Sequence, residues 1–221
     1  MVNRSTKIAV LFDFDGVVVD TETQYTQFWD AVGEKYLDKK NFGRLIKGTT
    51  LKQIFERYFS TVAECQEQIK SDLNVFEKQM SYDFIAGVED FIRELRQKEV
   101  SCAIVTSSNR QKMNRVLKVH PELPTLFDAI FIAEDFKKSK PDPDCFLIGM
   151  RHFGVEPQNT IVFEDSLMGL KAGDASGALV IGITTTLTEE EMEGLAIATF
   201  PDFTQITLSR ILEIKKELDE K

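Results

Sequence analysis

The sequence predicts an α/β protein whose parallel sheet is interrupted, after its first strand, by a small helical insertion. Short apolar runs rich in β-branched residues alternate with stretches of helical periodicity over most of the chain. The stretch from residue 22 to about residue 84 breaks this alternation, because it has helical spacing but no strand-like run. We therefore expect a core domain made of residues 1–20 and 85–221 and a helical domain made of residues 21–84.

Five apolar runs predict the strands of the core. They span residues 8–12, 102–105, 129–132, 161–163 and 179–183. Strands that alternate with helices favour a parallel sheet covered on both faces. Such sheets bind ligands at the carboxyl ends of their strands, so polar residues that follow these runs are the first candidates for a site.

Helical periodicity marks the segments between these runs. Phe91 and Leu95 indicate one helix, Met113 and Val116 a second. A third follows from the spacing of Phe146, Ile148, Met150 and Phe153. In the insertion, aromatic and aliphatic residues recur at helical spacing from Tyr25 to Phe76, and we interpret most of them as the core of the helical domain.

Composition excludes several classes of partner. The chain has 221 residues and a formal net charge of −9, without a basic cluster, which argues against nucleic acid and anionic membranes. The three cysteines are widely spaced and form no zinc or disulfide pattern, so we expect reduced, buried thiols and a cytoplasmic protein. The first apolar run is too short for a signal peptide. A monomer or weak dimer is expected.

The most informative residues are two carboxylates at the end of the first run. Asp13 and Asp15 alternate with Phe12 and Phe14 and are followed at once by Gly16. On an extended backbone both carboxylates point the same way. Like charges that close require a cation between them or a bound proton, so the pair predicts a Mg²⁺ site, an acid/base site, or both. In isolation the same residues would also suit a solvated loop before a helix.

The segment from Asp13 to Thr21 resembles motif I of the haloacid dehalogenase superfamily of phosphotransferases. Three later segments resemble the other motifs of that family, in the family's order: residues 100–108, which end in Thr106, Ser107 and Ser108; residues 139–144, which contain Lys140; and residues 160–166, which contain Glu164 and Asp165. The resemblance extends to the β-phosphoglucomutase-like and sugar-phosphate phosphatase branch. It implies a Rossmann-like core with a helical cap, which here is residues 21–84.

The resemblance also implies roles for these residues. Asp13 would be the nucleophile that forms an aspartyl-phosphate, and Asp15 would protonate the leaving group and then activate water. Mg²⁺ would be held by Asp13, the backbone carbonyl of Asp15, Glu164 and Asp165. Asp165 or Ser166 could equally cap the following helix, and capping can coexist with ligation.

Cations and hydrogen-bond donors for phosphate come from the other two motifs. Thr106 offers a hydroxyl, and Ser107 and Ser108 offer backbone N–H groups that open a helix. Lys140 would neutralise the phosphate and the nucleophile.

In the cap, Lys47 and Gly48 belong to a segment that resembles the branch's substrate-specificity loop. Tyr25 stands where the mutase has a histidine, and Leu51 where it has a phosphate-binding arginine. A mutase must hold a second phosphate in its cap, so these two departures favour a phosphatase.

The predicted function is therefore a Mg²⁺-dependent phosphatase of a small phosphorylated metabolite, such as a sugar phosphate. β-Phosphoglucomutase activity is the first alternative, and inorganic pyrophosphatase activity or a non-catalytic phosphate-binding module are further ones. Dehalogenase activity is disfavoured because the second carboxylate and the metal acids belong to phosphotransferases.

Overall fold

A computed structural model describes residues 7–47, 49 and 51–220 of the chain. The chain divides into two compact units, of which one is Asp20–Asp83 and the other contains the remaining described residues on either side of it. We call them the helical unit and the core unit, and describe each by itself.

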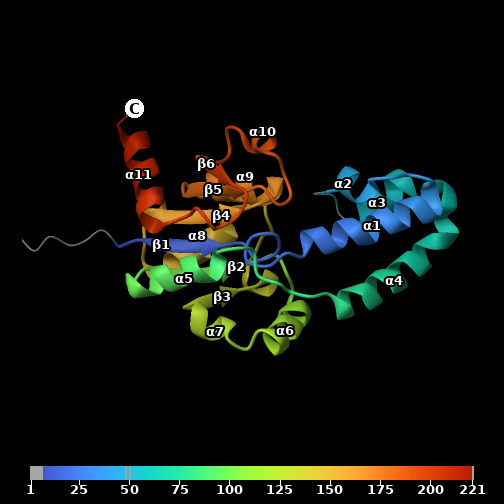
Figure 1. Cartoon of the computed structure of the whole chain (residues 1–221), viewed down its shortest axis with the longest axis horizontal. Coiled ribbons are helices and arrows are strands. Elements are labelled where there is room, and N and C mark those ends of the chain that lie inside the picture. Colours follow the sequence, from blue (N-terminus) through green and yellow to red (C-terminus); the bar gives the residue numbers. More distant parts are fainter. Residues whose placement is uncertain (1–6, 48, 50, 221) are drawn as a thin grey trace, which may run out of the picture. The chain divides into compact units, whose positions relative to one another are not determined.

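The core unit is a layered α/β structure (Figure 1). Its strands are β1 (Ala9–Phe12), β2 (Ser101–Val105), β3 (Ala129–Phe131), β4 (Thr160–Glu164), β5 (Leu179–Ile183) and β6 (Ala198–Phe200). Its α-helices are α5 (Val88–Gln97), α6 (Arg110–Val119), α7 (Leu123–Leu126), α8 (Asp144–Phe153), α9 (Leu167–Ala175), α10 (Glu189–Met192) and α11 (Leu208–Asp219). Short 3₁₀ turns occur at Ala133–Asp135 and Pro157–Asn159.

The six strands form one parallel sheet in the order β3-β2-β1-β4-β5-β6. This confirms the predicted fold class. Strand order reverses at β1, which lies between β2 and β4. A reversal of this kind opens a crevice at the carboxyl ends of the central strands. The ends of β1, β2 and β4 therefore meet where the sequence places Asp13, Thr106 and Asp165.

Successive residues of β1 pack on opposite faces of the sheet, as strand geometry requires. On one face, Leu11 belongs to a buried cluster with Phe146 of α8 and Leu170 of α9. On the other, the ring of Phe12 lies 6.1 Å from that of Phe91 in α5 and 5.1 Å from that of Phe163 in β4, measured between centroids. Because both faces are buried, the central strand β1 is apolar along its whole length.

One strand was missing from the sequence prediction. β6 has three residues, all only partly buried, and it pairs with β5 at the edge of the sheet. Thr199 interrupts the apolar residues of β6, and the strand contains no Val or Ile, so it lacks the apolar, β-branched run by which the other strands were recognised. The other five strands lie within one residue of the predicted runs at each end.

The helical unit contains α1 (Glu22–Leu37), α2 (Phe42–Leu45), α3 (Leu51–Tyr58), a 3₁₀ segment (Ser60–Cys65) and α4 (Gln66–Gln79), labelled in Figure 1. Its own apolar core includes Trp29 of α1, Phe42 of α2, Phe55 of α3 and Ile69 of α4. Aromatic residues from this segment thus fill the unit's interior, as their helical spacing indicated.

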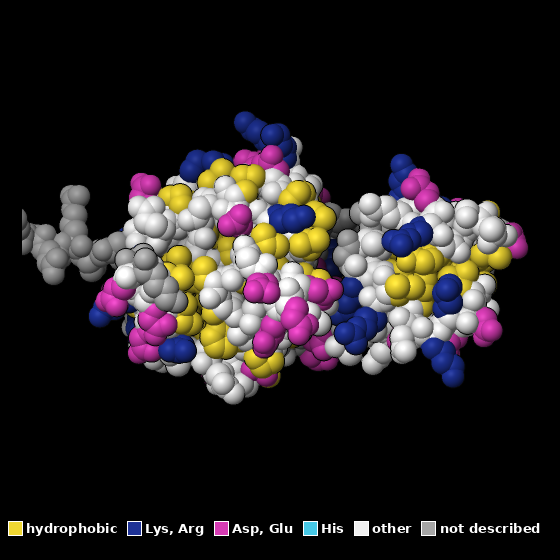
Figure 2. Space-filling view, turned by 90° about the horizontal axis from the view of Figure 1, so that it is seen from above, with side chains coloured by type: hydrophobic (Ala, Val, Ile, Leu, Met, Phe, Trp, Pro, Cys, Tyr) yellow, Lys and Arg dark blue, Asp and Glu magenta, His cyan; other side chains and the backbone are white. Residues whose placement is uncertain are grey.

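Other composition-based expectations can be compared with the structure. Cys65, Cys102 and Cys145 are buried and form no disulfide. In the described part of the chain, no helix is both long and apolar enough to span a membrane. Acidic and basic side chains are interspersed over the face drawn in Figure 2.

Candidate active site

The site begins in the tight turn that follows β1. The backbone N–H of Asp13 still donates to the carbonyl of Phe163, with a distance of 2.9 Å, so Asp13 continues the pairing with β4. Gly16 then adopts a φ of 76°, a left-handed conformation in which glycine is favoured. Its N–H donates to the carbonyl of Val19 at 2.8 Å and closes the turn. The carboxylate pair is therefore held on a backbone fixed at both ends.

Lys140 links two acids that come from different strands. Its Nζ lies 2.5 Å from Oδ1 of Asp13 and 2.5 Å from Oε1 of Glu164, and it also donates to the carbonyl of Val105 at 3.3 Å. The lysine side chain is only 6% exposed. A buried ammonium with this many acceptors is a fixed positive charge and not a solvated surface lysine.

Burial changes the proton affinities of this pair. Desolvation raises the pKa of Asp13 to about 7; the Lys140 ammonium opposes that shift, and the negative charge of Glu164 adds to it. Burial by itself would lower the pKa of Lys140, but the carboxylates of Asp13 and Glu164 outweigh it and raise that pKa above its ordinary value. The raised pKa of Lys140 indicates that negative groups outnumber positive groups around it.

Asp13, Glu164 and Asp165 form a buried acidic cluster. Each offers a carboxylate oxygen, and these three oxygens lie within 4.8 Å of one another. Together with Asp15 they make four carboxylates against the ammonium groups of Lys140 and Lys112, so the fully charged site has an excess of two negative charges. Carboxylate oxygens and a charge of this sign are what Mg²⁺ requires, so the residues present fit that ion.

The Glu164 carboxylate accepts several hydrogen bonds from neighbouring residues. Its Oε2 accepts from the backbone N–H groups of Asp165 and Ser166 at 3.1 and 3.3 Å and from the Ser166 hydroxyl at 3.1 Å. The Ser166 hydroxyl also accepts from the N–H of Gly169 and so caps α9. Of the two caps considered from the sequence, the structure shows Ser166.

Asp15 has a cation of its own, which the sequence analysis missed. Nζ of Lys112, in α6, lies 2.6 Å from Oδ1 of Asp15, and the hydroxyl of Ser108 donates to Oδ2 at 2.7 Å. The Lys112 side chain is 17% exposed. A charged residue near the start of a helix is typical of a solvated face, so no sequence signal distinguished Lys112.

The residues of the segment that resembles motif II have different surroundings. Thr106 is buried, and its hydroxyl accepts from the N–H of Ser108 at 3.0 Å. A hydroxyl that accepts in this way can still donate its own proton to an anion. Ser107 is exposed and lies two residues after β2 ends. The helix they precede is capped by Asn109, whose side chain accepts from the N–H of Lys112.

Two threonines after β5 were also missed. The Thr185 hydroxyl donates to the carbonyl of Gly16 at 2.6 Å, and the Thr186 hydroxyl donates to Oδ2 of Asp165. They follow a buried strand, like the other site residues, and this position was the available signal. The loop after β5 therefore joins the loops after β1 and β4 in one site.

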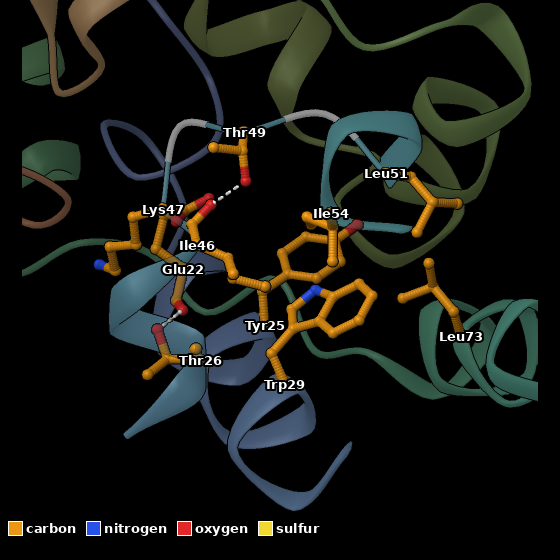
Figure 3. A pocket seen from close by; sticks show the side chains of 11 residues that line it. Glu22, Tyr25, Thr26, Trp29, Ile46, Lys47, Thr49, Leu51, Ile54 and Leu73 are labelled. Atoms are coloured by element: carbon orange, nitrogen blue, oxygen red, sulfur yellow. Dashed lines mark hydrogen bonds between the residues drawn. The ribbon is translucent and has the colours of Figure 1, made fainter. Parts of the chain in front are cut away.

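The helical unit contains a pocket of about 250 Å³ that includes two of the predicted cap residues, Tyr25 and Lys47. Figure 3 shows the rings of Tyr25 and Trp29 next to each other in this pocket, both from α1. The Tyr25 hydroxyl donates to Oε1 of Glu77 at 3.0 Å. Leu51, the first residue of α3, also lines the pocket. The predicted residue Gly48 lies outside the described residues.

The buried acidic cluster lies where the strand order of the parallel sheet reverses. The family model for haloacid dehalogenase-like hydrolases matches residues 10–183, and the chain belongs to that family.

Individual relatives have low sequence identity to this chain. The chain is 25% identical to a phosphorylated carbohydrates phosphatase of Thermotoga maritima over 95% of its own length and 99% of the relative. Its structure resembles that of a family IA, variant 3 hydrolase from Entamoeba histolytica, with a TM-score of 0.79, 22% identity, and coverage of 95% and 99%. It also resembles a β-phosphoglucomutase from Clostridium difficile, with a TM-score of 0.73, 22% identity, and coverage of 98% and 100%. At these identities the two solved structures show the fold alone.

Proposed function

We propose that this chain is a Mg²⁺-dependent phosphatase that hydrolyses the phosphate monoester of a small metabolite, such as a sugar phosphate, through an aspartyl-phosphate on Asp13. One observation carries the proposal: a buried carboxylate, Asp13, contacts a buried lysine and lies beside two further buried acids. The similarity to a phosphatase of phosphorylated carbohydrates supports the same substrate class.

In the first step, a carboxylate oxygen of Asp13 attacks the phosphorus atom. The bond from phosphorus to the ester oxygen breaks, and the carboxyl group of Asp15 donates its proton to that oxygen, so the alcohol leaves neutral. Lys112 and Ser108 hold the Asp15 side chain from two sides. The role of Lys140 is to keep Asp13 oriented and to offset the charge of the incoming phosphate.

In the second step, water attacks the phosphorus of the aspartyl-phosphate. Asp15, now ionised, takes a proton from that water, and the bond between phosphorus and Asp13 breaks. Free phosphate leaves and Asp15 is again protonated. The Thr106 hydroxyl, which accepts from the N–H of Ser108 and can still donate its own proton, and the backbone N–H of Ser107 would bind the phosphoryl oxygens in both steps.

Asp13, Glu164, Asp165 and the backbone carbonyl of Asp15 would hold Mg²⁺, either directly or through water. When bound, the ion supplies positive charge that offsets the charge on the phosphoryl oxygens. Tyr25 and Lys47 line one pocket within the helical unit, and their role in substrate binding stays a prediction.

The test is phosphate release from a panel of sugar phosphates and other small phosphate monoesters. Metal-free protein should release no phosphate, and added Mg²⁺ should restore turnover. Full turnover in the presence of EDTA would contradict metal dependence, and inactivity on every monoester in the presence of Mg²⁺ would contradict the proposed activity.

A further inference from the structure

Three consecutive threonines, Thr184, Thr185 and Thr186, follow β5 and make different contacts. Thr184 lies beside β6, where its hydroxyl is 3.5 Å from the carbonyl of Phe200. Thr185 and Thr186 turn toward the acidic cluster instead. No motif of the family described above includes them.

The hydroxyl protons can be assigned from the distances. Oγ1 of Thr185 lies 2.6 Å from the carbonyl oxygen of Gly16 and 3.4 Å from Oδ2 of Asp165. A hydroxyl has a single proton to donate, so the short contact assigns the Thr185 proton to Gly16. The Thr186 hydroxyl then supplies the side-chain donor to Oδ2 of Asp165.

These two hydrogen bonds restrain two parts of the proposed metal site: the backbone just after Asp15 and the carboxylate of Asp165. The Asp165 side chain is nearly fully buried, and a hydrogen bond to one oxygen fixes the rotation of its carboxylate. Gly16 directly follows Asp15, whose backbone carbonyl is a proposed metal ligand, so the Thr185 bond restrains the backbone next to that carbonyl. Hydrogen bonds to metal-ligating groups orient them, and their loss typically lowers metal affinity by about 10–100-fold.

We infer that Thr186 is a positioning residue for Mg²⁺ that acts through Asp165, and that Thr185 anchors the same loop to the turn after Asp15. This inference rests on the proposed function, because it requires that the acidic cluster binds Mg²⁺. The loop after β5 would then support the metal site without contributing a metal ligand itself.

The experiment is calorimetric titration of the metal-free full chain with Mg²⁺ alone, without substrate. T186V replaces the hydroxyl with a methyl group of similar size, and its dissociation constant for Mg²⁺ should rise by about 10–100-fold. T186S keeps the hydroxyl and should bind Mg²⁺ like the parent. T184V makes the same chemical change two residues away, outside the cluster, and should leave the dissociation constant unchanged.

Thermal unfolding in EDTA checks that each variant is folded, and T186A takes the place of T186V if the latter is not. A T186V protein that binds Mg²⁺ as tightly as the parent would overturn the inference and leave the proposed function intact. An equal loss in T184V and T186V would also overturn it, because the effect would then be a general one on the loop. A parent chain that binds no Mg²⁺ would overturn both.

Discussion

Lys140 and Asp13 are 127 residues apart in the sequence, and their side chains meet with an Nζ–Oδ1 distance of 2.5 Å. The contact joins the loop before α8 to the end of β1. Replacing the lysine in K140M leaves Asp13 and Glu164 buried without their shared cation. Since breaking a buried ion pair leaves an uncompensated charge, we expect the free energy of unfolding to fall by about 3 kcal/mol or more, with loss of phosphatase activity.

Urea denaturation in metal-free buffer measures this change. K138M is the matched control, because the Lys138 side chain is 72% exposed and forms a surface ion pair with Asp142. Its stability should stay within about 0.5 kcal/mol of the parent. Equal stabilities for K140M and K138M would show that the buried pair contributes nothing.

Gly169 provides the space that the Glu164 carboxylate occupies. A Cβ at position 169 would lie 1.9 Å from the carboxyl carbon of Glu164. G169A should therefore displace Glu164 and reduce activity, and it should destabilise the protein by about 1–3 kcal/mol despite the better helix propensity of alanine. G149A is the comparison, because Gly149 also lies within a helix and its Cβ would come closest to the two methyl groups of Leu11, at 2.9 and 3.0 Å.

Activity and chemical denaturation of both variants decide this point. We expect G149A to keep its activity and to lose less stability than G169A. A G169A protein with normal turnover would mean that Glu164 can move without consequence for the site.

Mg²⁺ binding should depend on pH around neutrality. Burial raises the pKa of Asp13 to about 7, so below that pH the metal-free site holds a proton that Mg²⁺ must displace. A raised carboxyl pKa makes protons competitors at low pH, so affinity increases as pH rises through about 7. Titration calorimetry at about pH 8 and about pH 6 should show an affinity roughly tenfold weaker at the lower pH. The same affinity at both would contradict a proton on Asp13.

Phosphate release should be faster than isomerisation of a sugar phosphate. Tyr25 and Leu51 stand where the family's mutase has cationic groups. The Tyr25 hydroxyl forms a hydrogen bond with the Glu77 carboxylate. Each missing charge-assisted hydrogen bond weakens retention of a bisphosphate intermediate by about one to two powers of ten. ³¹P NMR on β-glucose 1-phosphate, with a bisphosphate primer, follows both products. Isomerisation well ahead of free phosphate would establish the mutase.

The sheet and the acidic motifs could be predicted because their signals are local. Apolar runs of β-branched residues mark β1, β2, β4 and β5, and Asp13 and Asp165 follow directly after two of them. The edge strand β6 was not predicted, because Thr199 interrupts its apolar residues and it contains no Val or Ile.

Other residues reach the site only through tertiary contacts, so the local sequence pattern does not mark them clearly. Lys112 lies on a helix with several charged neighbours, and only the fold brings it to Asp15. Thr185 and Thr186 follow a strand, as site residues do, but hydroxyls at a strand end are common and their partners come from two other loops. Residues to which the family motifs assign a chemical role were thus easier to recognise than residues that would position them.

The central claim is that Asp13 carries the phosphoryl group during turnover. D15N should slow turnover by about 10²–10⁴-fold and allow the intermediate to accumulate. Acid quenching of D15N during turnover of p-nitrophenyl phosphate with Mg²⁺, followed by peptide mass spectrometry, should find one phosphoryl group on Asp13. The double variant D13N/D15N should show none. A phosphoryl group on another residue, or an unmodified Asp13 peptide while phosphate is being released, would contradict the account.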